Sequence, residues 1–344
     1  MRQPSPDLPV KAQDVWRARA AISGLVRRTP LVRAEALSEE AGADIHLKLD
    51  SLQETGSFKL RGATNRLAQL TDAERERGVV AVSTGNHGRA VAHAARRLGV
   101  AATVFLSDLV PVNKRAALEA AGATVRIAGH SQDQAFEAAH AFVAETGAVP
   151  VPPFDDPAIV AGQGTLGLEV LDDLPQIDSA LVPLSGGGLI SGIAVALKAA
   201  NPAIRIVGIS MDRGAAMIES LRAGRPVQVE EVESLADSLG GGIGLDNRVT
   251  FPICRALVDD VVTVTEDEIA HGMAHLYWHD RQVAEGAGAV AHAAFLAGKA
   301  GPLGRTAAVF VCGANVDMAL FTKVVTEYAP EPFRHAMIAP TPPI

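Results

Sequence analysis

The chain has 344 residues, of which 48% are hydrophobic and 20% charged, a composition typical of a globular protein and not of a disordered or fibrous one. Its formal net charge of −8 at pH 7, without dense runs of Lys and Arg, argues against a nucleic-acid or anionic-membrane partner and favours a small-molecule ligand. The two cysteines, Cys254 and Cys312, form no C-x-x-C pair, which indicates neither a disulfide framework nor a zinc knuckle and predicts a reducing cytoplasm.

The length fits about two domains. The first residues carry no apolar signal region, and no apolar run approaches the roughly 18 residues that span a bilayer. We therefore expect neither export nor a membrane anchor.

Lys59 lies in the stretch TGSFKLRG (55–62), after a Gly-Ser turn at the start of a predicted helix. Most single lysines are surface residues, and the helix dipole disfavours a lysine at this end unless the amine has a use. One use is an imine with a cofactor aldehyde, for which a lysine with a pKa lowered by burial is suited.

Short β-rich runs alternate with helical patterns further along the chain. The predicted strands are 79–83, 102–106, 124–128, 180–185, 204–210 and 306–312, and the predicted helices are 87–99, 113–123 and 188–200. This alternation is typical of parallel strands joined by crossover helices, so an α/β architecture is predicted. We place a smaller domain at 79–150, inserted into a larger one made of 1–78 and 151–344, with VPPFDDP (151–157) as the joint.

Consecutive glycines in LSGGGLISG (184–192) follow a predicted strand and open a predicted helix. In this context backbone N–H groups form an anion cradle that fits a phosphate, and the alternative is a tight left-handed turn. The spacing of Gly186, Gly188 and Gly192 departs from G-x-G-x-x-G, which disfavours a nicotinamide cofactor, and the absence of G-x-x-x-x-G-K-[ST] disfavours a nucleotide triphosphate. A second glycine stretch, 239–247, is predicted to be a loop.

Four motifs, TGSFKLRGATN, STGNHGRAVA, SGGGLISGI and VCGANVD, follow one another in this order. Through them the chain, from about residue 15 to 325, resembles the fold-type II (tryptophan synthase β-like) pyridoxal-phosphate enzymes, specifically the threonine dehydratase and serine racemase group. The resemblance implies two α/β domains, each with a largely parallel sheet flanked by helices, pyridoxal 5'-phosphate as the cofactor, and a homodimer.

The resemblance also implies roles for individual residues. Lys59 would be the Schiff-base lysine and the base that removes the substrate's α-proton, and a neutral Cys312 facing the pyridine nitrogen would favour elimination. Ser83 and Thr84 would also be catalytic. The cofactor-binding residues would be Ser57, Phe58, Lys59, Asn86, Gly186, Gly187, Gly188, Leu189 and Cys312. The substrate-binding residues would be Ser83, Thr84, Gly85 and His87, although His87 fits an ordinary packed histidine equally well.

Three departures from the group's pattern change the expectations. Ser210 and Ala216 stand where serine racemase-type members have acidic metal ligands, with only Asp212 nearby, so we predict no divalent activator at 210–217. Thr84 stands where racemases of the group have a serine, which weakens racemisation without excluding it. The chain ends about thirty residues after Asn315, so feedback by isoleucine is not expected.

The stretches 151–171, 208–217 and 236–247 look most like the dehydratases of hydroxyectoine utilisation. The resemblance then implies a dehydratase that acts on a β-hydroxy α-amino acid related to 3-hydroxy-2,4-diaminobutyrate. The alternatives are an amino-acid (serine) racemase, a 3-hydroxyaspartate dehydratase and a catalytically silent pyridoxal-phosphate-binding protein.

Two further features stand near the C-terminal end. His271, His275 and His279 have a helical spacing that puts them on one face, and without an H-E-x-x-H arrangement or a carboxylate ligand set a solvated face is expected in place of a metal site. Glu285 lies in a small, apolar stretch where a buried carboxylate would need a partner. The resemblance puts it near the cofactor pocket, with a structural role equally open.

Overall fold

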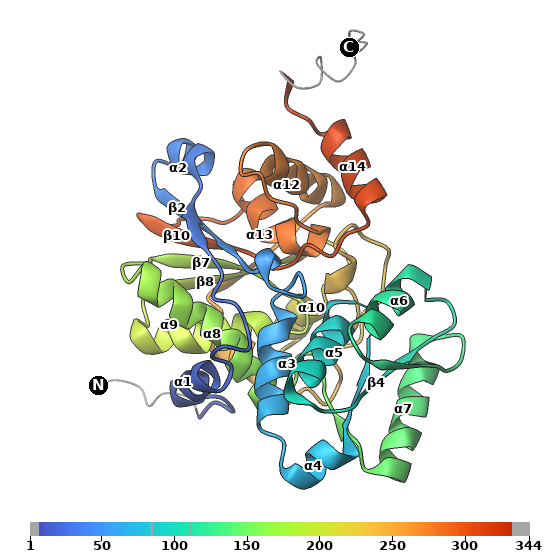
Figure 1. Cartoon of the computed structure of the whole chain (residues 1–344). Coiled ribbons are helices and arrows are strands. Elements are labelled where there is room, and N and C mark those ends of the chain that lie inside the picture. Colours follow the sequence, from blue (N-terminus) through green and yellow to red (C-terminus); the bar gives the residue numbers. More distant parts are fainter. Residues whose placement is uncertain (1–6, 84, 111, 332–344) are drawn as a thin grey trace.

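The computed structural model describes residues 7–83, 85–110 and 112–331, and its strands form two sheets (Figure 1). A six-stranded sheet has the order β1-β2-β10-β7-β8-β9, and a four-stranded sheet has the order β5-β4-β3-β6. Every pair of neighbouring strands is parallel except β1 and β2. The strands are β1 (Leu31–Arg33), β2 (Asp44–Leu49), β3 (Val79–Val82), β4 (Ala102–Leu106), β5 (Thr124–Ile127), β6 (Val149–Pro150), β7 (Ser179–Pro183), β8 (Arg205–Met211), β9 (Asp260–Val264) and β10 (Thr306–Val311).

Helices surround both sheets. They are α1 (Ala12–Ala21), α2 (Glu35–Ala41), α3 (Lys59–Ala68), α4 (Asp72–Arg77), α5 (Asn86–Leu98), α6 (Val112–Ala120), α7 (Gln132–Thr146), α8 (Pro157–Asp173), α9 (Gly188–Ala200), α10 (Ala216–Ala223), α11 (Thr250–Leu257), α12 (Glu266–Trp278), α13 (Gly286–Leu296) and α14 (Met318–Glu327), with short 3-10 turns η1 (Asp50–Leu52) and η2 (Asp237–Leu239). Among the described residues, no helix combines the length and the apolar character needed to cross a bilayer.

The six-stranded sheet is covered on both faces. Helices α12, α13 and α14 cover one face, and α8 and α9 cover the other (Figure 1). Successive residues of β10 point to opposite sides, so Val309 packs with the first group and Phe310 with the second. All six residues of β10 are buried, which explains why its sequence is a continuous apolar run without the alternation of a half-exposed strand.

The four-stranded sheet is built in the same way on a smaller scale. Val79 and Ala81 of β3 pack with α3 and α5, and Val80 packs with α7 on the other face. Helix α3 lies in the N-terminal part of the sequence. It nevertheless contacts both α5, which covers this sheet, and α8, which covers the larger one.

The six strands and three helices predicted from the sequence are confirmed within a few residues, as is the predicted loop over 239–247. Strands β1, β2, β6 and β9 were missed. The division into 79–150 and the remainder stays a proposal, which rests on the fact that every strand of the four-stranded sheet lies within that range.

Candidate active site

The site forms where two central strands end side by side. Strands β7 and β10 are parallel neighbours, so the glycine loop that follows β7 and Cys312, which follows β10, meet at one edge of the sheet. The segment before α3 is attached to the same edge, because Ser57 forms a bridge with Gly313 and the Phe58 amide donates to the Cys312 carbonyl at 3.1 Å. These contacts bring Lys59 to the ends of both strands.

Lys59 is the first residue of α3, and its Nζ donates to the Pro153 carbonyl oxygen at 2.8 Å. The residue keeps some accessible surface, but its surroundings remove enough water for desolvation to lower the pKa of the amine to about 8, against the opposing influence of Cys312 and Glu285. An amine with this pKa is partly neutral at physiological pH and can act as a nucleophile or base.

The glycine loop is shaped so that side chains are excluded. Gly187, the N-cap of α9, has φ +86°, and a Cβ there would approach Met217 Cε at 2.8 Å. A Cβ on Gly186 would collide with the ring of Phe154. The first amides of a helix have no acceptor within it, so together the loop and the start of α9, with Gly188 and Leu189, offer N–H groups to an anion such as a phosphate.

The loop after β3 lies on the other sheet and reaches the same place. Ser83 directly follows the strand, Gly85 is the N-cap of α5, and Thr84, expected here from the sequence, lies outside the described residues. Asn86 donates from Nδ2 to Glu285 Oε1 at 2.7 Å and accepts from Asn315 Nδ2 at 2.6 Å. The Asn86 side chain thus joins the small sheet to residues after β10 and before α13.

His87 is buried, and its Nε2 lies 2.8 Å from the carbonyl oxygen of Val151. Burial, helped by the positive charge of Lys59, lowers the pKa of the imidazole to about 3, so the neutral ring donates from Nε2 to that carbonyl. These are the contacts of a packed histidine. The substrate-binding role of His87 stays a prediction.

Glu285 is the N-cap of α13 and only 4% exposed. Burial and the nearby negative charge of Asp237 raise the pKa of its carboxyl group to about 7, while hydrogen bonds from Asn86 and from the Asn315 amide favour the charged form. The Glu285 carboxylate therefore has the hydrogen-bond partners that the sequence led us to expect for a buried carboxylate. Its negative charge also raises the pKa of Lys59, in opposition to desolvation.

Cys312 is buried beside Lys59, and burial, reinforced by Glu285, raises the pKa of its thiol far above the ordinary value. It is therefore neutral over the physiological range. Cys254 is also neutral, because burial raises its pKa to about 12. It lies below the glycine loop, where a Cβ on Gly187 would approach its Sγ at 3.0 Å.

A buried network of charged side chains links α3 to neighbouring elements. Arg61, two residues after Lys59, donates to Asp50 Oδ1 at 2.8 Å and to Glu169 Oε1 at 2.5 Å. Lys48 donates to Glu169 Oε2 at 2.6 Å. All four side chains are at most 9% exposed. Sequence reasoning missed these partners, because they come from separate elements.

Sequence reasoning also missed Pro153, Phe154 and Asn315 as parts of the site. The stretch 151–157 was interpreted only as a joint between domains, although it supplies the carbonyl that holds Lys59 and the ring that packs on Gly186. The adjacent prolines Pro152 and Pro153 were the available signal, since Pro-Pro gives an ordered, extended segment.

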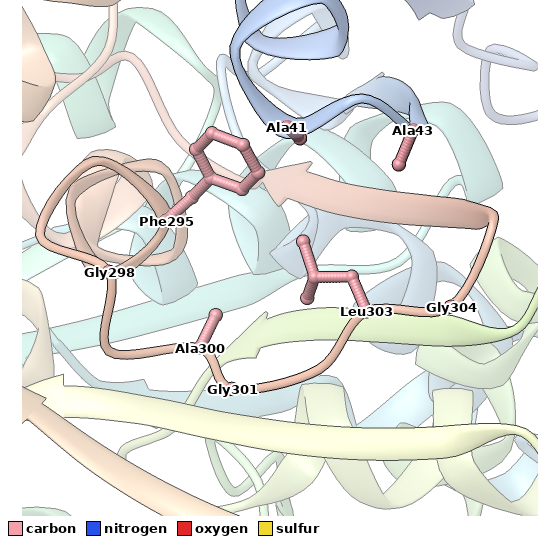
Figure 2. A pocket seen from close by; sticks show the side chains of 8 residues that line it. All are labelled: Ala41, Ala43, Phe295, Gly298, Ala300, Gly301, Leu303 and Gly304. Atoms are coloured by element: carbon pink, nitrogen blue, oxygen red, sulfur yellow. The ribbon is translucent and has the colours of Figure 1, made fainter.

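The described residues line, among others, two cavities of about 270 Å³ each. One opens between α5, α6 and the loop before α3, is lined by Glu54, Arg89 and Asn315 among others, and adjoins the candidate site. The other lies at the opposite edge of the large sheet, under the loop that leads into β10, where Phe295 and Leu303 face small residues and no lining side chain is titratable (Figure 2). The apolar lining of this second cavity offers no side chain that could take part in a reaction with Lys59.

Comparisons with known proteins agree with this geometry. The family profile described as pyridoxal-phosphate dependent enzyme matches residues 22–313. A Sinorhizobium fredii protein with the provisional name threonine dehydratase is 53% identical over 91% of this chain and 94% of its own length. The L-threonine ammonia-lyase of Thermotoga maritima is 41% identical over 92% of this chain and 79% of its own length. The solved structure of maize serine racemase superposes with a TM-score of 0.86 at 32% identity, covering 95% of this chain and 99% of that one.

Proposed function

Because the chain belongs to the family of pyridoxal-phosphate dependent enzymes, we propose that it removes water from a β-hydroxy α-amino acid and releases a 2-oxo acid and ammonia. It is a lyase of the threonine dehydratase and ammonia-lyase kind, and its cofactor is pyridoxal phosphate. The observation that carries the proposal is the convergence of a Lys59 amine with a pKa of about 8, the glycine loop and the neutral Cys312 at one edge of the sheet.

The residues present fit the cofactor. The loop from Gly186 to Leu189 excludes side chains and exposes helix amides, which suits its phosphate. Ser57 Oγ is buried without a hydrogen-bond partner among the described residues, which leaves a polar atom free for a bound group. When bound, pyridoxal phosphate withdraws electrons from the substrate's α-carbon.

Lys59 is the base in this proposal. Held by the Pro153 carbonyl, its amine is partly neutral at physiological pH and can take the α-proton. Cys312 carries no negative charge, so its thiol would not stabilise a proton on the cofactor's ring nitrogen. The loop of Ser83 and Gly85 at the start of α5 is suited to a substrate carboxylate, because the positive end of the helix dipole lies there.

We further propose that the natural substrate carries a second amine, as 3-hydroxy-2,4-diaminobutyrate from hydroxyectoine does. Support comes from the charge around the site. Glu285 is buried near Lys59, and Asp237 is close enough to raise the pKa of Glu285. A distal ammonium group would relieve the repulsion between these two carboxylates, whereas the methyl group of threonine would not.

The test of the reaction is ammonia and 2-oxo acid release by the purified holoenzyme from threonine, serine, threo-3-hydroxyaspartate and 3-hydroxy-2,4-diaminobutyrate. We expect release from at least one β-hydroxy amino acid and the highest kcat/KM with the diamino acid. A preference for threonine would overturn the substrate proposal alone. No ammonia from any of the four, with the cofactor bound, would overturn the elimination.

Lys59→Ala tests the assignment of the base. We expect loss of the visible absorbance of the lysine-bound cofactor and of ammonia release, with a Tm close to that of the wild type, because the amine contributes little to the core. Lys323→Ala, an exposed position on α14, is the matched control and should retain both signals. A coloured, active Lys59→Ala protein would contradict the assignment.

Racemisation is the second candidate, favoured by the superposition on maize serine racemase. It predicts that L-serine incubated with the enzyme acquires the D-enantiomer, which chiral chromatography would detect. We expect elimination to be faster. The homodimer and the cytoplasmic location predicted from the sequence also belong to the proposal, and sedimentation of the holoenzyme tests the former.

A further inference from the structure

Three side chains at the C-terminal end of α12 and on α13 form a cluster outside the candidate active site. His275 lies in the last turn of α12, Asp280 follows that helix, and His292 lies in the middle of α13. One nitrogen or oxygen ligand atom from each of the three lies within 4.8 Å of the others. The carboxylate that seemed to be missing beside His275 in the sequence is thus supplied by Asp280, and an additional imidazole by His292.

The atoms of the cluster are close enough to share one partner. His275 Nδ1 and His292 Nε2 form a hydrogen bond of 3.0 Å, which a bound ion would replace, and His275 Nδ1 lies 3.8 Å from Asp280 Oδ2. In a tetrahedral zinc site with bonds of about 2.0 Å, ligand atoms are separated by about 3.3 Å. Small side-chain rotations would therefore place all three atoms around one ion.

One ligand atom of the cluster has no hydrogen-bond partner. Asp280 Oδ2 is buried and unpartnered among the described residues, and the Asp280 side chain is only 11% exposed. His292 Nδ1 is also buried without a partner, but the ring nitrogen that lies beside His275 is Nε2. Leaving a buried carboxylate oxygen unpaired costs free energy. Native proteins remove that cost with a partner, and in this cluster the neighbouring groups are imidazoles.

Neutral imidazole is the form that binds metals, and it offers the lone pair of one ring nitrogen. His279 stacks on His275 with ring centroids 4.1 Å apart, which restrains the orientation of that ring. His271, one turn earlier, is exposed and lies outside the cluster.

We propose that His275, Asp280 and His292 bind a divalent first-row transition metal ion of the zinc class, with a water molecule as the fourth ligand. Two imidazoles and one carboxylate are a donor set that such ions prefer over Mg²⁺ or Ca²⁺. The site differs from the 210–217 position, where no activator is expected, and it does not depend on the reaction proposed above.

The position of the ion gives it a structural role. Asp280 and Glu285 lie at the two ends of the short connection between α12 and α13, and His292 follows Glu285 by seven residues, or two turns, on the same helix. An ion bound to both helices would fix this connection and, through it, the N-cap residue Glu285 of the active site. It would also stabilise the folded chain by mass action.

The experiment uses untagged holoenzyme, so that the phosphate site is filled and no purification tag binds metal. The protein is treated with a chelator, dialysed against Zn²⁺ or Co²⁺, and analysed for metal per chain, for Co²⁺ d–d absorption and for Tm. We expect one ion per chain, a tetrahedral Co²⁺ spectrum and a higher Tm with metal for the wild type.

Variants locate the ion. Asp280→Asn and His292→Asn should each weaken binding at least tenfold, whereas His271→Asn, the exposed neighbour on α12, should bind as the wild type does. Asp280→Asn preserves the shape of a partly accessible side chain, so it decides the matter if His292→Asn does not fold. Failure of the wild type to retain metal, or equal retention by Asp280→Asn, overturns the proposal.

Discussion

Lys59 and Glu285 have shifted pKa values for one reason, which is that burial disfavours the charged form of each. Desolvation lowers the pKa of the amine to about 8 and raises that of the carboxyl group to about 7. The negative charge of Glu285 opposes the shift of Lys59 only in part. Both groups therefore titrate within the physiological range, unlike an ordinary lysine or glutamate.

The amine of Lys59 must be neutral to attack an aldehyde, which gives a pH dependence for cofactor uptake. We expect the rate at which apoenzyme regains visible absorbance on adding pyridoxal phosphate to rise about tenfold per pH unit below pH 8 and to level off above it. Stopped-flow absorbance measures this rate. A plateau reached only near the ordinary lysine value of 10.5 would contradict the assigned environment.

Glu285 contributes a pH dependence of stability. Its folded-state pKa is raised, so the folded apoenzyme binds more protons than the unfolded chain between the ordinary value of 4.5 and about 7, and stability falls as pH rises through that window. Glu285→Gln keeps an acceptor for Asn86 and removes the charge. We expect the Tm of this variant to exceed that of the wild type increasingly from the lower to the upper end of the window, as scanning fluorimetry would record.

At the scale of single residues, the sequence pointed to side chains that could be reactive, but not to the residues that surround them. Lys59 and Cys312 stand in recognisable motifs. The bond from Asn86 to Glu285 joins residues 199 positions apart, and His292, which completes the proposed metal cluster, has no spacing relation to the histidines of α12. Contacts of this kind depend on how the helices pack, which no local pattern encodes.

Among the elements, α3 depends on charges that are out of contact with water. Its Arg61 offsets two buried carboxylates, Asp50 and Glu169, and these raise the pKa of the guanidinium group although burial opposes them. Removing one partner of such a network leaves uncompensated charge in a medium of low polarity. Helix α3 carries Lys59 at its N-terminus, so the network also determines where that amine lies.

Arg61→Ala should be strongly destabilising. We expect a loss of about 3–5 kcal/mol and a fall in Tm on the order of 10 °C, measured by thermal unfolding of the apoenzyme. Arg66→Ala, on the same helix and paired with Asp156 at 3.5 Å at a partly accessible site, is the control and should change Tm by no more than a few degrees. Equal effects of the two substitutions would contradict a special role for the buried network.

The glycines of α9 show why motif spacing and packing are easily confused. Gly186 and Gly187 are needed in the loop, whereas a Cβ on Gly192 would collide with backbone atoms of Val160 and Gly164 on α8. The sequence predicted the helix from 188 to 200 with its observed ends. It could not separate the glycines that are predicted to hold an anion from one that lets two helices touch.

For the whole molecule, the two sheets are joined across the candidate site by polar side chains. Arg89 of α5 donates to Asn315 Oδ1 at 2.9 Å, and Asn315 in turn contacts Asn86 and the carbonyl of Thr55. Strands β3, β4, β7, β8 and β10 were predictable because they are largely buried apolar runs. The missed β1 and β9 are partly exposed edge strands, and β6 has two residues, so their patterns are weak.

Arg89→Ala should loosen the connection between the sheets without unfolding either one. We expect KM to rise about fivefold, as the loss of one partly exposed charged hydrogen bond implies, with Tm nearly unchanged. Steady-state kinetics with the best substrate measures the change. Arg96→Ala, exposed on the same helix, should behave as the wild type does, and a similar loss in both variants would point to a general effect of charge.

The burial of both thiols has a practical consequence for covalent probes. Alkylating reagents and oxidants attack thiolates, and neither Cys254 nor Cys312 ionises at neutral pH. The apoenzyme should therefore survive iodoacetamide and mild peroxide unmodified. An amine-directed electrophile, by contrast, would meet in Lys59 an unusually nucleophilic lysine, so that single-site labelling for inhibitor screening becomes feasible without engineering a cysteine.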